Sequence, residues 1–197
     1  MPEKRDRNIP PGVLNEARRT IVNKVTGETV VFHKYGHETK GEYAEVTIDC
    51  LPGGGPPLHY HTSYNERFEG LEGEATVYAG GLDNPVIVKP GDVVFVPMGM
   101  NHRFTSKKDT VKIKGQVLPA HSGFERSLYI LFGLNEDSLT DKEGMPKSLV
   151  HTAIISEMSD MKFPGIGGVF MNTLLMALAW YGRWSGEEEK LLRTYWD

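Results

Sequence analysis

The chain has 197 residues, of which 39% are hydrophobic and 24% are charged, and its formal net charge is −4. These values suit a folded domain with an appended segment, and they argue against a nucleic-acid partner, which needs a concentrated basic face. The single cysteine, Cys50, excludes an internal disulfide and a zinc site built from several cysteines. The charged N-terminus lacks the apolar core of a signal peptide, so we expect a cytoplasmic protein.

Residues 1–24 have the character of a polar N-terminal arm, and the alternating residues that follow predict strands in the middle of the chain. In the stretches EYAEVTIDCL and VKIKGQVL, apolar and polar residues alternate, which is typical of half-buried strands. Shorter strand candidates, separated by turns rich in glycine, proline and asparagine, lie at 29–32, 58–61, 67–68, 75–79, 86–88, 93–96 and 102–105. Many short strands at regular spacing predict a sandwich or barrel over residues 25–120.

The pattern changes after the strands, and residues 121–197 predict a helical extension that packs on the barrel or on a partner. The expected helices are 124–134, 148–161, 172–184 and 187–195. Between Lys162 and Arg183 no side chain carries a formal charge. Glycines and a proline at its start leave a compact apolar part that is too short to span a membrane, so a membrane contact is disfavoured. We expect a buried helix that covers the barrel mouth or builds the interface of a homodimer.

A group of potential metal ligands stands in the stretch GGGPPLHYHTSYNERFEGLEG, residues 53–73. Side chains alternate along an extended segment, so His59 and His61 are expected to point to the same side. Glu66 follows after a bend and can fold back toward them. His102, which follows a tight turn, is the candidate for a fourth ligand. Three neutral imidazoles and one carboxylate suit one divalent transition metal ion, and iron, nickel, manganese, cobalt, copper and zinc are all compatible with this set.

With these residues in place, the sequence resembles the cupin superfamily and, more loosely, its quercetinase-like members. The first cupin motif, G-x5-H-x-H-x(3,4)-E-x6-G, matches Gly53, His59, His61, Glu66 and Gly73. The second motif, G-x5-P-x-G-x2-H-x3-N, matches Gly91, Pro97, Gly99 and His102, with Ser106 in place of the usual asparagine. The resemblance covers about residues 28–120. It implies a mainly β fold, a small cupin barrel of the jelly-roll type, with the three histidines and Glu66 as metal ligands.

Together the residues and the resemblance favour a metal-dependent enzyme that acts on a small molecule. Glu66 is the candidate base toward a substrate proton. Phe68 and Phe104 are in phase with the ligands and are candidate pocket residues, although a plain barrel core would explain them equally well. The favoured reaction is dioxygenase-like, on an enol or aromatic substrate. A redox-neutral isomerase, epimerase or lyase and a non-catalytic small-molecule-binding cupin are the alternatives, because a fold does not fix a function.

Overall fold

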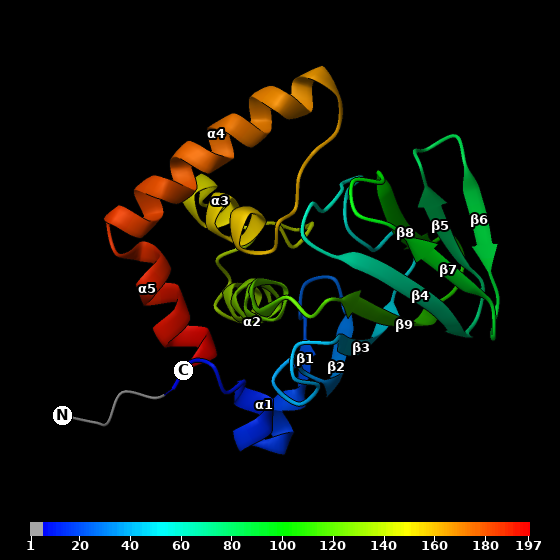
Figure 1. The fold of residues 1–197 in the computed structure, drawn as a ribbon, viewed down its shortest axis with the longest axis horizontal. Coiled ribbons are helices and arrows are strands. Elements are labelled where there is room, and N and C mark those ends of the chain that lie inside the picture. Colours follow the sequence, from blue (N-terminus) through cyan, green and yellow to red (C-terminus); the bar gives the residue numbers. More distant parts are fainter. Residues whose placement is uncertain (1–5) are drawn as a thin grey trace.

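The computed structural model describes residues 6–197, and Figure 1 shows a β barrel on one side of the molecule and a group of helices on the other. The strands are β1 (Thr20–Val22), β2 (Thr29–Lys34), β3 (Ala44–Cys50), β4 (Asn65–Glu72), β5 (Ala75–Ala79), β6 (Pro85–Val88), β7 (Val93–Val96), β8 (His102–Ser106) and β9 (Val111–Leu118). The helices are α1 (Pro11–Leu14), α2 (Ser122–Glu136), α3 (Leu149–Met158), α4 (Gly165–Trp184) and α5 (Glu187–Leu191), with a 3-10 turn at Glu16–Arg19 and a π-helical turn at Leu192–Trp196.

The strands pair in antiparallel fashion in two sheets that form the barrel. The larger sheet has the order β1-β2-β3-β9-β4-β7, and the smaller sheet has the order β6-β5-β8. Along β9 every second residue is buried, as the alternating sequence predicts. The buried faces of the two sheets share an apolar core that includes Phe68, Val77, Val88, Val96 and Ile113. The mainly β architecture expected from the sequence is therefore confirmed.

A second apolar core joins the larger sheet to the helices. It contains Phe32 from β2, Ile130 from α2, Ile154 from α3 and Trp196 at the end of the chain. The Trp196 side chain is 1% exposed, and its ring lies edge-on to that of Tyr129 at 5.3 Å between centroids. The last residues of the chain therefore pack in one core with the barrel strands.

Several boundaries differ from the expected ones. Residues 58–61 were expected as a strand but form isolated bridges, because two prolines precede them and a turn follows at once. Part of the N-terminal arm is an edge strand, since β1 pairs with β2. Helix α4 begins at Gly165, seven residues before the expected start. Gly168 makes this possible, because a Cβ there would lie 2.1 Å from the carbonyl oxygen of Phe163.

Helix α4 exposes much of its apolar surface. Its buried residues are Gly168, Leu175, Ala179 and Gly182, which form one line along the helix, and two of them pack with Ala153 of α3. The large apolar residues that face outward are Ile166, Val169, Phe170, Met171, Leu174, Met176, Trp180, Tyr181 and Trp184. The expectation of a buried helix is therefore wrong for the single chain, because α4 rests on α3 at the outer edge of the helical group (Figure 1).

The length and composition of α4 alone would allow it to cross a membrane. Core helices of soluble proteins reach the same length and apolar composition, so these two properties do not assign α4 to a membrane. Only 22% of its most apolar window is buried, so α4 is not a core helix within one chain.

Candidate metal centre

The four predicted ligands come from three parts of the barrel. His59 and His61 lie in the segment between β3 and β4, Glu66 is in β4, and His102 begins β8. The His59 N–H donates to the His102 carbonyl at 3.0 Å, and the His102 N–H donates to the His59 carbonyl at 2.7 Å. The Gly99 N–H donates to the His61 carbonyl at 2.7 Å, from a φ of +79° that favours glycine. Backbone hydrogen bonds thus bring the two sequence motifs together.

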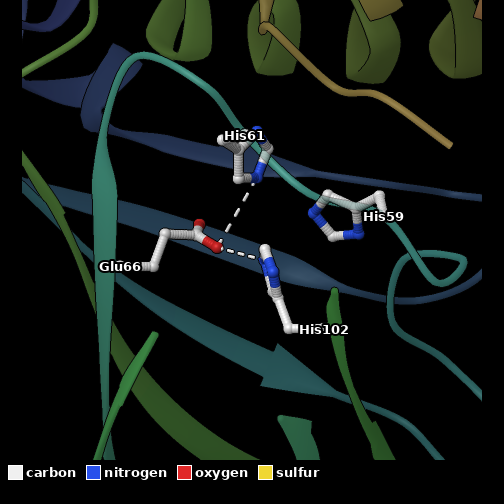
Figure 2. A group of neighbouring side chains, drawn as sticks. All are labelled: His59, His61, Glu66 and His102. Atoms are coloured by element: carbon white, nitrogen blue, oxygen red, sulfur yellow. Dashed lines mark ion pairs between the residues drawn. The ribbon is translucent and has the colours of Figure 1, made fainter. Parts of the chain in front are cut away.

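The ligand atoms of the four side chains converge on one point, as Figure 2 shows. One nitrogen from each histidine and one carboxylate oxygen all lie within 4.8 Å of one another. The Oε2 atom of Glu66 lies 2.5 Å from Nε2 of His102 and 3.6 Å from Nε2 of His61. All four residues are buried, with Glu66 the most exposed at 9%. The structure therefore brings together every residue that the sequence proposed as a ligand.

The backbone fixes the tautomer of each histidine in this cluster. In all three rings Nδ1 lies within hydrogen-bond distance of a main-chain carbonyl, which can only accept. The acceptors are Pro57 for His59 at 2.7 Å, Asp160 for His61 at 3.1 Å and Met100 for His102 at 2.9 Å. With the proton on Nδ1, each neutral ring has its Nε2 lone pair free, which is how the outer contacts of a metal site orient histidine ligands.

The cluster has more acceptors than protons. Within residues 6–197, neither Glu66 Oε2 nor His102 Nε2 has a hydrogen-bond partner, although the two atoms almost touch. Two buried acceptors at this distance need a cation between them, and a proton on His102 or a metal ion can fill that role. The residues therefore fit a divalent metal ion, which would satisfy all four groups at once.

In the metal-free site, the pKa values of His59 and Glu66 agree with that donor set, whereas the pKa of His102 favours a proton in the place of the metal ion. Burial lowers the pKa of His59 to about 3, helped by the nearby His102, so the ring stays neutral as a ligand must be. Burial would also lower the pKa of His102, but the adjacent Glu66 carboxylate outweighs it and raises that pKa. Burial would raise the pKa of Glu66, but its contacts with His102 and His61 lower it, so Glu66 is ionised.

A cavity of about 240 Å³ opens onto the ligands, and both predicted pocket residues line it. Phe68 and Phe104 are 3% and 7% exposed, and their ring centroids are 5.5 Å apart. Other apolar lining residues include Val46 and Val117 from the barrel and Leu128, Leu131, Ile155 and Phe163 from the helical part. No lysine or arginine of residues 6–197 lines this cavity. Arg67 instead contacts Glu69 and Gln116.

Three features of the site were not predicted from the sequence. The first is the contact of Asp160 with His61, which is 99 residues away in the chain. Tyr64, in the turn after His61, also contacts that ring and links it to Ser159. A helical cover was expected from the apolar helix that became α4, but among the described residues the helical wall of the cavity comes from α2, α3 and the turn before α4, and no residue of α4 lines it. Gly115 leaves a gap in the inward-facing row of β9, next to Val46 and Phe68. A signal for Gly115 was present, because it interrupts the apolar alternation of VKIKGQVL.

The other histidines and the cysteine lie outside the cluster. His121 accepts a hydrogen bond from the Phe124 N–H at the start of α2, and His151 pairs with Glu187 at 3.0 Å. Cys50 is fully buried, and this burial raises the pKa of its thiol to about 11. Cys50 is therefore a core residue rather than a reactive thiol.

Comparison with known proteins places the barrel in a family. Residues 46–114, which include all four ligands, match the family model of the cupin domain. No curated protein has significant sequence similarity to the chain. Among solved structures, KdgF from Halomonas sp. is 13% identical, with a TM-score of 0.46 over 54% of this chain and 91% of that one.

Two further solved structures are similar over smaller shares of the chain. A cupin 2 conserved barrel domain protein from Rhodopseudomonas palustris is 18% identical, with a TM-score of 0.41 over 47% of this chain and 61% of that one. The DMSP lyase DddQ from Ruegeria pomeroyi DSS-3 is 26% identical, with a TM-score of 0.36 over 40% of this chain and 39% of that one. On the family match of residues 46–114, with which the two antiparallel sheets and the buried His/Glu cluster agree, the barrel of this chain belongs to the cupin superfamily.

Proposed function

We propose that this chain is a metal-dependent enzyme that oxidises an enol or aromatic small molecule in a dioxygenase-like reaction. The observation that carries the proposal is the convergence of four buried acceptor side chains at the end of an apolar cavity. Burying four acceptor side chains without a cation costs free energy of folding, and a bound metal ion would offset that cost and provide a reactive centre.

His59, His61, Glu66 and His102 would hold one divalent transition metal ion, and iron, nickel, manganese, cobalt, copper and zinc are all compatible with these ligands. The bound ion would supply a Lewis acid for a substrate oxygen and, if it is redox-active, a route for electrons from the substrate to O2, whose two oxygen atoms enter the product.

The side chains around the ligands have separate roles in this proposal. The Glu66 carboxylate, ionised and facing the cavity, accepts the hydroxyl proton of an enol or phenol as that oxygen approaches. Phe68 and Phe104, whose rings contact each other, form an aromatic wall against which the apolar body of the substrate packs. The helical wall excludes water from the reacting atoms. The cavity volume of about 240 Å³ favours a small substrate.

The same ligands would also suit a redox-neutral isomerase, epimerase or lyase, or a cupin that binds a small molecule without turnover. A sugar phosphate is a poor substrate for either, because it needs cationic side chains. Among residues 6–197, no lysine or arginine lines the cavity.

Oxygen uptake by the metal-loaded protein tests the proposed reaction. Wild type should consume oxygen with at least one member of a panel of enols and phenols. Gly115→Leu should keep its metal but lose uptake at least tenfold, because a side chain there grows into the cavity between Val46 and Phe68. Product formation without oxygen uptake would favour the redox-neutral reaction, and ligand binding without any product would favour the binder.

We also propose that the chain forms a homodimer through α4, whose outward face carries the apolar residues named above. Phe170, which is 73% exposed, provides the test. Wild type should have the mass of a dimer in light scattering, and Phe170→Glu should have that of a monomer. A monomeric wild type would contradict the proposal, and sedimentation of that monomer with lipid vesicles would assign the face to a membrane. Deleting residues 162–197 would be a poorer test, because it also removes Trp196 from the core.

A further inference from the structure

The turn between α3 and α4 lies directly against the segment that carries His61. Tyr60 and Lys162 form a backbone bridge in which each N–H donates to the other's carbonyl at 2.9 Å. The Tyr64 hydroxyl donates to the Ser159 carbonyl at 2.8 Å, and the Tyr64 ring stacks on His61 with 4.3 Å between centroids. The helical part of the chain is therefore in contact with the ligand segment on both sides of His61.

Asp160, at the centre of this turn, holds the ligand segment through both its main chain and its side chain. Its carbonyl accepts the Nδ1 proton of His61 at 3.1 Å. Its carboxylate accepts from the Thr62 N–H at 2.6 Å and the Ser63 N–H at 2.8 Å. The two hydroxyl groups also donate to this carboxylate, that of Thr62 at 3.0 Å and that of Ser63 at 2.7 Å.

The residues that the carboxylate holds are the link between two ligands. Thr62 and Ser63 begin the turn that leads from His61 to Glu66. Fixing this turn fixes the distance between the two ligand side chains, and the carbonyl of Asp160 fixes the rotation of one of them. Charge-assisted hydrogen bonds of this kind are stronger than neutral ones, so four of them form a rigid connection.

We propose that Asp160 is a positioning residue of the metal centre, which orients His61 and sets its place relative to Glu66 from outside the barrel. The inference rests on the proposed metal site, but not on the reaction that the metal supports. It means that the helical part of the chain is needed for metal affinity, even though all four ligands belong to the barrel.

The backbone at Asp160 makes a clean substitution possible. Its φ is +52°, a conformation that glycine and asparagine adopt more readily than other residues. Asp160→Gly therefore suits the backbone and keeps the carbonyl, but removes the carboxylate. Asp160→Asn keeps one acceptor oxygen. Ser138→Gly is the matched control, because Ser138 also has a positive φ, of +59°, just after a helix and is exposed.

The test is a titration of metal-free, full-length protein with Co²⁺, followed by calorimetry and by the visible absorption of the bound ion. Relative to wild type, we expect the Kd of Asp160→Gly to rise roughly 10- to 100-fold, with altered absorption bands. We expect a smaller, several-fold rise for Asp160→Asn and no change for Ser138→Gly. The melting temperature of each metal-free variant shows whether the fold is kept.

An Asp160→Gly protein with the Kd and absorption bands of wild type would overturn the inference while leaving the metal site in place. If Asp160→Gly does not fold, Asp160→Asn decides, and a wild-type Kd and spectrum there would overturn the inference in the same way. A wild type that binds no Co²⁺ would instead overturn the proposed metal site, and the inference with it.

Discussion

Adding a divalent transition metal to the metal-free protein is expected to raise its melting temperature, and His102→Ala is expected to remove that rise. A ligand that binds the folded state alone, at 100 times its Kd, adds about 2.7 kcal/mol to the free energy of unfolding. For a chain of this length that corresponds to roughly 5–10 °C. In His102→Ala the set of four buried ligands is incomplete, and the contact between Nε2 and the Glu66 carboxylate is lost.

Thermal melting with and without metal measures this effect, with His33→Ala as the control. His33 is exposed and lies outside the ligand cluster, so its variant should keep the full rise. An equal rise in His102→Ala would show that the stabilising ion binds elsewhere.

The second large effect is expected at the end of the chain, where Trp196→Ala should cost about 3–5 kcal/mol of unfolding free energy. The Trp196 side chain is 1% exposed in the core shared by β2 and the helices, and its Nε1–H donates to the Arg7 carbonyl at 3.1 Å. Truncation therefore leaves a cavity and removes a hydrogen bond.

Both variants carry Phe170→Glu, which is expected to make the chain monomeric, since α4 is the proposed dimer face. Trp184→Ala is then the matched control, because this tryptophan, in α4, is 74% exposed. Its loss should change the unfolding free energy of the monomer by about 0.5 kcal/mol or less. Chemical denaturation of both variants measures the difference. Equal effects would contradict the burial of the chain end in the common core.

The parts of the fold that could be predicted are those encoded locally. Alternation in β3 and β9 and the turns between short strands follow from neighbouring residues. The ligands were found because His59, His61 and Glu66 stand within eight residues of one another and His102 follows a recognisable turn. Figure 2 shows these side chains turned toward one point.

The parts that could not be predicted depend on contacts between distant segments. Nothing near Asp160 in the sequence indicates that its carboxylate will hold Thr62 and Ser63. The apolar composition of α4 suggested burial, but α3 covers only one line of its residues. An apolar helix face indicates that the face is buried against something, but it does not identify whether the contact is the same chain, a partner or a membrane.

Elemental analysis of the purified, tag-free protein tests the proposed metal centre most directly, with wild type compared with His61→Ala and His33→Ala. The expected result is about one iron, nickel, manganese, cobalt, copper or zinc ion per chain in wild type and His33→Ala, and a small fraction of that in His61→Ala. A wild type that contains no metal, even after reconstitution, would contradict the account and leave a barrel that binds its ligand by shape alone.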